Sequence, residues 1–588
     1  MGRCIRGIES DFEIAVIASP DRGEAISVKV GDCFGRRTPP RNDDRLYAGI
    51  ILFVKRAIIF LITSCLLTSC IGNASLWGQY QTPTPNGGIP VVTTPMPDVY
   101  PTNIFVHDLP TQTPPPEHTA TPTSLMNMFV TQPASSTPEA LTPTIDGNSL
   151  LYYAQSGDWL PAVANRFGVD VSEITSPKIL PETGFVDPGT LLIIPDRLDK
   201  SLQYTTPLPI IPDSEFVFSA TALDFDTAAY VQSAGGYLST YREYLGTTAW
   251  TSGARGIERL AYENSVNPRL LLAILDYESQ WVRGRPANEF DTKYPMGYES
   301  YLNIGMFGQL TWAINQMSAG YYGWRTGKIN ELTFLDGNTL HLDPTLNAGT
   351  VAIFVLFSRL HTLNEWLRIV DQNSGFPAYY QGMFGDPWGR ATAVSNFFPP
   401  NFNQPDMTLP IEPNITWSLT GGPHSAWGVD VNGPLAALDF APQGDKSGCI
   451  PTTTWIVAMA AGLVVRSGNG VVVVDMDGDG HEQTGWNIMY MHVATKDRVP
   501  VGTWVEQDDR IGHASCEGGN STGTHTHIAR KDNGEWMLAD GPIPFVMSGW
   551  TTIAGDKPYL GKLVKGNKVI TADVYGQAWS LITRDNDE

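Results

Sequence analysis

A long stretch rich in Thr and Pro limits where folded structure can begin. From about residue 72 to residue 147 the chain repeats patterns such as Thr82-Pro83-Thr84-Pro85 and has no apolar periodicity. This composition buries too little surface to offset chain entropy, so we predict a semi-extended spacer over residues 71–149. Single hydrophobic cores stop growing at roughly 250 to 300 residues. A chain of 588 residues should therefore carry several domains, mainly after the spacer.

An apolar run before the spacer predicts export. Residues 57–68 follow two basic residues, and the run has the length of a signal-peptide core but is too short to cross a membrane. Its end, Leu67-Thr68-Ser69-Cys70, resembles the lipobox of bacterial lipoproteins. The resemblance implies a lipid anchor on Cys70, with residues 1–70 as an N-terminal extension and lipoprotein-type signal. We expect an exported, membrane-anchored protein of the cell envelope; an uncleaved signal anchor is the alternative.

Charge and cysteine placement describe the environment in which the chain works. The formal net charge of −22 excludes nucleic acid as a partner, because a protein that binds a polyanion needs clustered Lys and Arg. Of the six cysteines, only Cys449 and Cys516 lie after the spacer. An exported protein could join these two in a disulfide, but the sequence leaves their geometry open.

Residues 150–198 have the pattern of one small module. Strand patterns at 151–154 and 191–195 enclose a helix pattern at 160–167. The segments 153–160, 164–169 and 189–195 resemble the LysM module in order and spacing. The resemblance implies a small βααβ fold that binds glycans containing N-acetylglucosamine.

Helical periodicity dominates residues 213–399, where we expect a mainly α domain. One predicted helix begins at Asn267-Pro268, since Asn caps helices and Pro suits the first turn. Near its end lies Glu278, followed by Ser279, in a context that resembles the catalytic helix of soluble lytic transglycosylases and goose-type lysozymes. Residues 303–310 are similar to the Gly-and-Gln loop of that family, which faces its active site.

This second resemblance implies a lysozyme-like domain that cleaves glycan strands with Glu278 as the acid. A partly apolar cleft raises the pKa of a carboxyl group and keeps it protonated for donation to a glycosidic oxygen. Tyr321, Tyr322 and Trp324 could supply stacking faces for sugar rings. The alternative is a helical domain that keeps the fold without the activity.

Short β runs separated by Gly-rich turns predict an all-β, antiparallel domain over residues 415–575. Four histidines fall at informative positions in it. Residues two apart in a strand share a face, so His525 and His527 should project into one cleft. Neutral imidazole and carboxylate are ligands of catalytic zinc, which takes three from the protein and leaves a fourth position for water. His424, Asp439 and His527 meet that count.

The pieces of this domain resemble the lysostaphin and LytM-type zinc endopeptidases. They share a His-to-Asp pair, the strand motif Tyr490-Met491-His492 and the motif His525-Thr526-His527. The resemblance implies Zn2+ bound by His424, Asp439 and His527, with His492 and His525 orienting and deprotonating water or stabilising the oxyanion. The segment between His424 and Asp439 is longer than usual. The context Asp439-Phe440-Ala441 favours this carboxylate over Asp430.

A run of alternating acidic residues, Asp475, Asp477 and Asp479 followed by Gly480, is similar to the start of a calcium loop. Its twelfth position is Trp486, where such loops place a bidentate Glu. A polar hairpin tip fits the same residues, so both interpretations stay open.

The sequence as a whole predicts a multidomain peptidoglycan hydrolase. We expect a zinc-dependent endopeptidase of wall peptides, combined with glycan-strand cleavage by the middle domain and glycan binding by the LysM-like module. A protein in which only the peptidase is active is one alternative. Another, from a different class, is a non-catalytic cell-wall scaffold or hydrolase activator.

Overall fold

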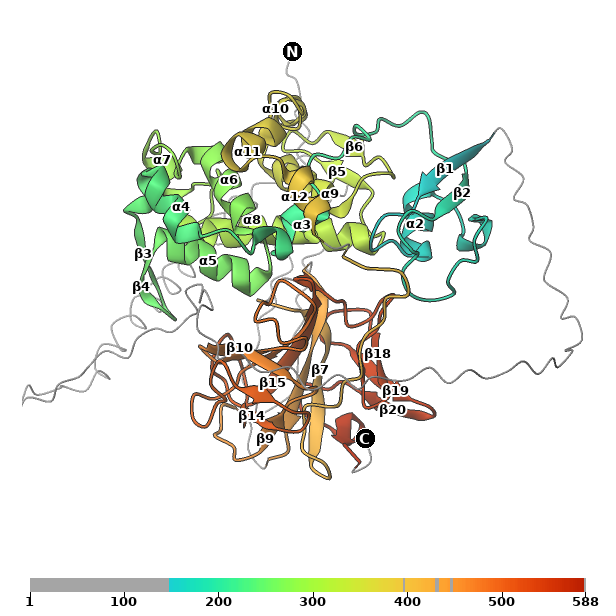
Figure 1. Cartoon of the computed structure of the whole chain (residues 1–588), viewed down its shortest axis with the longest axis vertical. Helices are drawn as coiled ribbons and strands as arrows, with labels where there is room; N and C mark the ends of the chain where they lie inside the picture. The colour runs from blue at the N-terminus through green and yellow to red at the C-terminus, as the bar shows by residue number, and fades with distance from the viewer. Residues whose placement is uncertain (1–147, 395–396, 429–432, 445–447, 586–588) are drawn as a thin grey trace, which may run out of the picture. The chain divides into compact units, whose positions relative to one another are not determined.

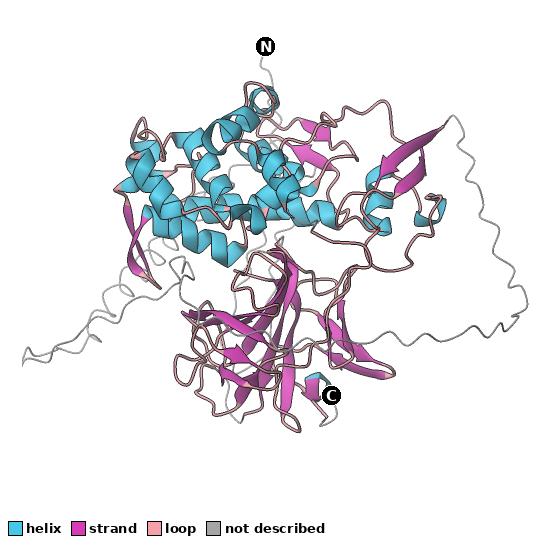
Figure 2. Ribbon diagram, in the orientation of Figure 1, coloured by secondary structure: helices cyan, strands magenta, loops and turns pink. Residues whose placement is uncertain are grey.

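The computed structural model of the protein describes residues 148–394, 397–428, 433–444 and 448–585 (Figure 1). The predicted signal, the anchor at Cys70 and the spacer lie outside these residues. Within the described ranges, no helix combines the length and apolar character needed to cross a membrane. Helices are concentrated in the middle of the chain and strands in its C-terminal part (Figure 2).

The N-terminal module is built on two antiparallel strands, β1 (Ser149–Tyr153) and β2 (Leu191–Pro195), with Leu151 opposite Ile193. Helix α2 (Leu160–Phe167) packs its apolar side into the module's core and ends at Gly168, whose φ of 67° is left-handed. The predicted second helix is only a 3-10 turn, Val171–Glu173. Asp170 and Glu173 close this turn by a reciprocal capping box, which satisfies its backbone without a longer helix.

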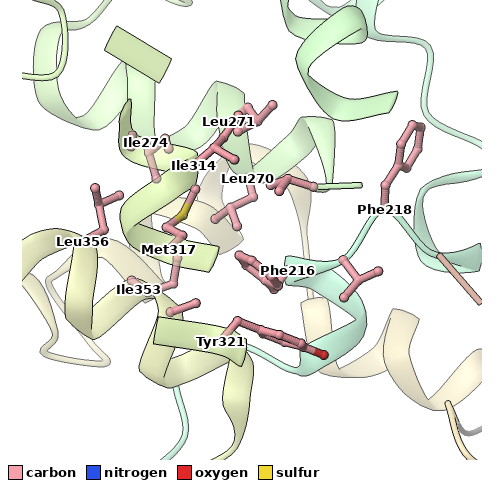
Figure 3. Packing of buried hydrophobic residues seen from close by; sticks show 14 of the residues in the cluster. Phe216, Phe218, Leu270, Leu271, Ile274, Ile314, Met317, Tyr321, Ile353 and Leu356 are labelled. Carbon is pink, nitrogen blue, oxygen red and sulfur yellow. The ribbon is translucent and has the colours of Figure 1, made fainter. Parts of the chain in front are cut away.

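The middle domain is helical because its chain repeatedly supplies helix caps and apolar faces. In α6 (Pro268–Ser279), the Asn267 side chain accepts from the Arg269 backbone, and Gln280 ends the helix with φ 55°. Residues 270–275 of α6 are fully buried. Side chains from α6, α8 and α9 point toward one another around Phe216 (Figure 3). The helices are α3 (Asp213–Phe216), α4 (Thr227–Ala234), α5 (Gly253–Asn264), α6, α7 (Glu289–Lys293), α8 (Gly305–Arg325), α9 (Ala348–Leu360), α10 (Leu363–Ile369), α11 (Phe376–Phe384) and α12 (Pro387–Ala393).

Two short hairpins extend from the helices of the middle domain. One pairs β3 (Arg242–Leu245) with β4 (Ala249–Ser252), and the other pairs β5 (Glu331–Thr333) with β6 (Thr339–His341). Both are two-stranded sheets in the part of the chain that the structure describes. The fold is therefore mainly α, as predicted.

The C-terminal domain is antiparallel β throughout its strand pairings, as predicted. Its main sheet has the order β13-β10-β11-β12-β15-β8-β7-β21, with β16 beside β15, and a smaller sheet has the order β17-β18-β19-β20. The strands are β7 (Thr416–Ser425), β8 (Leu435–Pro442), β9 (Trp455–Val457), β10 (Gly462–Gly468), β11 (Val471–Asp475), β12 (Trp486–Met491), β13 (Trp504–Val505), β14 (Arg510–His513), β15 (Thr526–Asp532), β16 (Glu535–Trp536), β17 (Val546–Met547), β18 (Trp550–Ala554), β19 (Gly561–Lys565), β20 (Lys568–Thr571) and β21 (Leu581–Thr583).

The apolar run at residues 456–465 is divided between two sheets. Its first part is β9, which pairs with β14, whereas its second part belongs to β10, which pairs with β11 and β13. Between them the chain turns at a segment whose Met459 backbone donates to the Tyr490 hydroxyl. Apolar composition indicated burial here, but the pairing partners decided where each strand ends.

Side chains on the two faces of the main sheet pack into two different hydrophobic cores. On β15, Ile528 belongs to a core with the smaller sheet, whereas Ala529 belongs to the core that contains the helices. This follows from the alternation of side chains along a strand. A buried polar cluster joins the same surfaces: Arg325 lies 3.0 Å from the Glu535 carboxylate, and the Tyr321 hydroxyl donates to it at 2.7 Å. The helical and β domains thus share one buried interface.

We expect Glu535→Ala to lower the free energy of unfolding by about 3–5 kcal/mol, because it leaves the buried Arg325 guanidinium with less compensation. Chemical denaturation followed by tryptophan fluorescence measures this change. As a control, Glu331→Ala removes a partly exposed partner of His341 and should cost less than about 1 kcal/mol. Equal effects of the two variants would contradict the role given to the buried pair.

Candidate metal centre

Three neighbouring strands bring the predicted metal ligands together. His424 lies on β7, Asp439 on β8 and His527 on β15. Asp439 is directly opposite His527 in the ladder, so their side chains share a face. The β7–β8 register shifts on both sides of Gly421, and such irregularities re-aim side chains. The Asp430 alternative lies outside the described residues.

A glycine makes room for the carboxylate of this cluster. A Cβ atom at Gly421 would lie 2.6 Å from Oδ2 of Asp439, closer than van der Waals contact allows. Gly421 faces Asp439 across the β7–β8 ladder. The glycine at position 421, three residues before His424, thus leaves the space that the Asp439 carboxylate occupies.

The three ligand atoms form a triangle of nearly equal sides. Nε2 of His424 lies 3.0 Å from Nδ1 of His527, and Oδ1 of Asp439 lies 3.2 Å from each of these nitrogens. Tetrahedral zinc with bonds of about 2.0–2.1 Å sets its ligand atoms about 3.3 Å apart. Oδ1 of Asp439 is also buried without a hydrogen bond to any described residue. These residues therefore fit one zinc ion.

Backbone carbonyls fix which nitrogen of each ligand faces the centre. Nδ1 of His424 lies 2.8 Å from the Gly422 carbonyl oxygen, and Nε2 of His527 lies 3.0 Å from that of Ala426. A carbonyl oxygen can only accept, so each of these nitrogens donates a proton. The other nitrogen of each ring then presents a lone pair toward Asp439, as a metal ligand must.

Two more histidines border the triangle, and both carry their proton on Nδ1, as His424 does. His492, just after β12, donates from Nδ1 to the Glu517 carbonyl at 2.8 Å, and His525, just before β15, donates to the Gly523 carbonyl at 2.7 Å. Their ring centroids are 4.4 Å apart. Nε2 of His525 lies 3.8 Å from Oδ1 of Asp439. Both rings thus carry an unprotonated Nε2 beside the candidate zinc position.

The electrostatic environment keeps Asp439 in its ligand form and His492 in its base form. Burial, followed by the nearby His525 and His527, lowers the pKa of His492 to about 3. Burial alone would raise the pKa of Asp439, but the electrostatic influence of the neighbouring His424 and His527 holds it well below the usual range. At neutral pH the site therefore offers a carboxylate and a neutral imidazole at these two positions.

A disulfide braces the loops that hold the bordering histidines. Cys449 and Cys516 are bonded, closing a loop with a sequence separation of 67. Glu517, whose carbonyl accepts from His492, is the next residue, and the Thr524 backbone donates to the carbonyl of Gly448 at 3.1 Å. The cross-link that the sequence left open is therefore part of the site's frame.

One neighbour of the site was missed in the sequence. The Tyr559 ring stacks on His424 with centroids 4.1 Å apart, and its backbone exchanges hydrogen bonds with Gly422 and Pro423. Tyr559 is 46% exposed, so part of the ring borders the space open to a substrate. No motif surrounds Tyr559, and only the packing of the β18–β19 connection against β7 places it here.

Glu278 lies on α6, in the helical domain, and is not among the residues that form the metal centre. Its Oε1 lies 3.0 Å from Nε2 of His361, and only 10% of its side chain is exposed. Burial would lower the pKa of His361, but its hydrogen bond and charge interaction with Glu278 raise it. Glu278 is therefore engaged with an imidazole rather than free to meet a glycosidic oxygen.

Two expectations about the surroundings of Glu278 are wrong. Tyr321, Tyr322 and Trp324 are all buried in the core of α8, because they pack against α3, α9 and the β-domain, and they offer no face to a sugar. The predicted loop at residues 303–310 is helical from Gly305 onward. Its Gln309 is fully buried and donates to the backbone carbonyls of Tyr298 and Asn303, which is a structural role.

Removing the cross-link by Cys449→Ser together with Cys516→Ser should lower the free energy of unfolding by about 2–5 kcal/mol. Zinc content should persist, because His424, Asp439 and His527 stand on strands rather than on the cross-linked loops. Thermal denaturation and elemental analysis of the purified variant measure the two quantities. Loss of zinc in a folded variant would show that the loops, not the strands, hold the metal.

Comparison with known proteins relates more than half of this chain to one protease. Residues 209–396 match the model of the LasA N-terminal domain. Protease LasA of Pseudomonas aeruginosa is 26% identical over 354 residues, which cover 56% of this chain and 75% of that protein. This similarity is longer than residues 209–396 and so extends beyond them.

Further relatives match a shorter part of the chain. The β-lytic metalloendopeptidase of Achromobacter lyticus is 27% identical over 154 residues, covering 26% of this chain and 39% of that protein. The M23 metalloprotease pseudoalterin is a similar solved structure, with a TM-score of 0.25, 22% identity and coverage of 31% of this chain and 99% of that one. Similarity to Protease LasA and to the β-lytic metalloendopeptidase supports a metallopeptidase domain in this chain, with zinc as its cofactor.

Proposed function

We propose that the protein is a zinc-dependent endopeptidase that cleaves the peptides of bacterial peptidoglycan. The observation that carries this proposal is the triangle of His424, Asp439 and His527 atoms, 3.0–3.2 Å apart. The similarity to Protease LasA and to β-lytic metalloendopeptidases supports the same reaction class. An inert scaffold would not need to keep ligand atoms, lone pairs and bordering bases in this arrangement.

The three ligands and the two bordering histidines have different roles: the ligands bind the metal, and the bordering histidines transfer protons. His424, Asp439 and His527 would hold the zinc ion, which would supply a Lewis acid to polarise the scissile carbonyl and lower the pKa of water toward neutrality. The unprotonated Nε2 atoms of His492 and His525 are placed to orient this water and accept its proton. Each ring stays oriented through its bond to a backbone carbonyl.

The same geometry determines when His492 or His525 could donate a hydrogen bond to the oxyanion. Neither His492 nor His525 has a proton on Nε2 at the start, because each ring's single proton is on Nδ1. A ring that accepts a proton from the attacking water becomes an imidazolium, which then donates to the oxyanion or to the leaving amine. Deprotonation thus precedes stabilisation in this arrangement.

Peptidoglycan as the substrate rests on the sequence as well as on the relatives. The module at residues 150–198 has the strands and first helix expected of a LysM-like unit, and glycan binding by it is part of the proposal. It is joined to the helical domain, since Nε1 of Trp159 donates to the Arg325 carbonyl at 2.9 Å. Anchoring at Cys70, which lies outside the described residues, is an inference from sequence alone.

Glycan cleavage by Glu278 is not part of the proposed function. The contact with His361 and the buried aromatic residues of α8 provide no observation that favours it. The match of residues 209–396 is to the LasA N-terminal domain. A helical domain that supports and covers the sheet fits these contacts without a second active site.

We expect His525→Ala to reduce cleavage of purified peptidoglycan by at least about 100-fold, since it removes a base that accepts a proton from water. The variant should keep one zinc per chain, whereas His527→Ala should lose it, because His527 is a ligand. Mass spectrometry of released fragments and elemental analysis separate the two effects. His341→Ala, in the helical domain, serves as the matched histidine control and should change neither quantity. Full cleavage by zinc-free His527→Ala protein would end the proposal.

Glu278→Gln should leave the fragments released from the wall unchanged, because its carboxylate contacts His361 rather than an open cleft. Chromatography of the digested glycan strands, with and without the substitution, tests this expectation. Loss of anhydro-sugar products in the variant would instead restore Glu278 as a catalytic acid. His361→Gln provides the reciprocal variant, since it frees Glu278 while leaving the metal centre intact.

A further inference from the structure

A second cluster of oxygen ligands lies at the tip of the β11–β12 hairpin. Oxygen atoms of Asp475, Asp477 and Asp479 all lie within 4.8 Å of one another. Asp475 is the last residue of β11, and the other two are exposed on the loop that follows. The histidine centre borders the opposite end of β12, where His492 follows Met491. The acidic cluster is therefore a separate site.

Two buried oxygens without partners point to a ligand here. Asp475 is fully buried and Asn487 is 1% exposed, yet Oδ1 of each has no hydrogen bond with the described residues. The two residues are cross-strand neighbours in the β11–β12 ladder, so their side chains lie on the same face. A buried oxygen left unpaired costs about 1–3 kcal/mol. Because the two residues lie opposite each other in the ladder, their unpaired oxygens call for a shared partner.

The orientation of the Asn487 amide is set by its other end. Nδ2 donates to the Thr484 carbonyl at 2.8 Å and to the Gly485 carbonyl at 3.3 Å. Because only the nitrogen can donate, the amide cannot be flipped without losing both bonds. The atom of the Asn487 amide that has no partner is thus its oxygen, the type of atom that binds a hard cation.

The charge of the cluster is not balanced by basic side chains. Among the described residues, no Lys or Arg forms an ion pair with Asp475, Asp477 or Asp479, while the nearby Arg466 and Lys531 both pair with Glu482. Burial, together with the charges of Asp477 and Asp479, raises the pKa of Asp475 to about 7. Adjacent carboxylates of this kind need a shared proton or a bound cation.

We propose that this loop binds one Ca2+ ion through Asp475, Asp477, Asp479 and the amide oxygen of Asn487. A set of oxygen ligands without nitrogen or sulfur selects a hard cation, and Ca2+ accepts the irregular geometry of a loop. Gly478 and Gly480 have φ of 73° and 93°, which lets the backbone turn around the cluster. Asn487 supplies the closing oxygen that Trp486, one residue earlier, cannot.

The bound ion stabilises the place where the two large domains meet. The loop end at Gly485 exchanges backbone and side-chain hydrogen bonds with Asn533, at 2.9 and 3.1 Å. Nδ2 of Asn533 in turn donates at 3.2 Å to the carbonyl of Phe397, just after the helical domain. Calcium binding should therefore raise the thermal midpoint of the whole chain.

Calcium titration of the full chain, freed of calcium but with its zinc content verified, tests the site. We expect one calcium per chain by calorimetry and a higher midpoint of thermal unfolding. Terbium provides an optical probe, because a Cβ on Gly478 would lie 2.7 Å from the ring of Trp504, which is thus close enough to sensitise its emission. Calcium should displace terbium and quench this emission.

The variant Asp477→Asn/Asp479→Asn removes two exposed ligands and leaves the buried strand intact. It should weaken calcium binding by about 100-fold or more and keep its zinc. The control Asp556→Asn, also exposed and in the same domain, should bind calcium normally. Asp475→Asn should stabilise the calcium-free chain, since it removes an unbalanced buried charge, and should abolish the calcium-induced rise in midpoint. Absence of calcium heat with the wild-type chain, or undiminished binding by the double variant, would overturn the proposal.

Discussion

The register between β8 and β15 is the constraint on which the metal centre depends. Asp439 lies opposite His527, and Met491 of β12 lies opposite His527 on the other side. A slip by one residue in either ladder would turn a ligand to the opposite face of the sheet. The apolar residues that alternate with the ligands, such as Leu438 and Ile528, are fully buried and hold this register. Packing of the sheet thus sets the positions of the three candidate ligands.

Alternation along the strands also explains how one sheet belongs to two cores. Side chains next to His527 in sequence pack toward the smaller sheet, while those two positions away pack toward the helices. The face that bears the ligands is therefore the face that continues under the helical domain. Arg325, Tyr321 and Glu535 fasten the two domains over it through buried polar contacts.

Backbone carbonyls, rather than charged groups, define the chemistry of the histidines. Each of the four rings donates one proton to a carbonyl oxygen, and so each offers one lone pair to the centre. The carbonyls of Gly422 and Ala426 lie beside the bulged part of β7, and those of Glu517 and Gly523 lie on loops near the disulfide. Rigid backbone thereby replaces the carboxylates that often orient metal-bound histidines.

Sequence by itself determined which side chains could form the candidate metal centre, and that the middle part is mainly helical and the C-terminal part antiparallel β. Spacing alone put His525 and His527 on one face, and apolar periodicity gave α6 and the antiparallel β-domain, since both signals are local. Tertiary structure decided what depends on distant partners: that Tyr559 stacks on His424, that Cys449 reaches Cys516, and that Tyr321 is buried instead of facing a sugar. Likewise, Glu278 lies on the predicted helix, but its contact with His361, at the end of α9, depends on the tertiary structure. Periodicity reports which side of an element is apolar, whereas only the packing of elements far apart in the chain determines what meets that side.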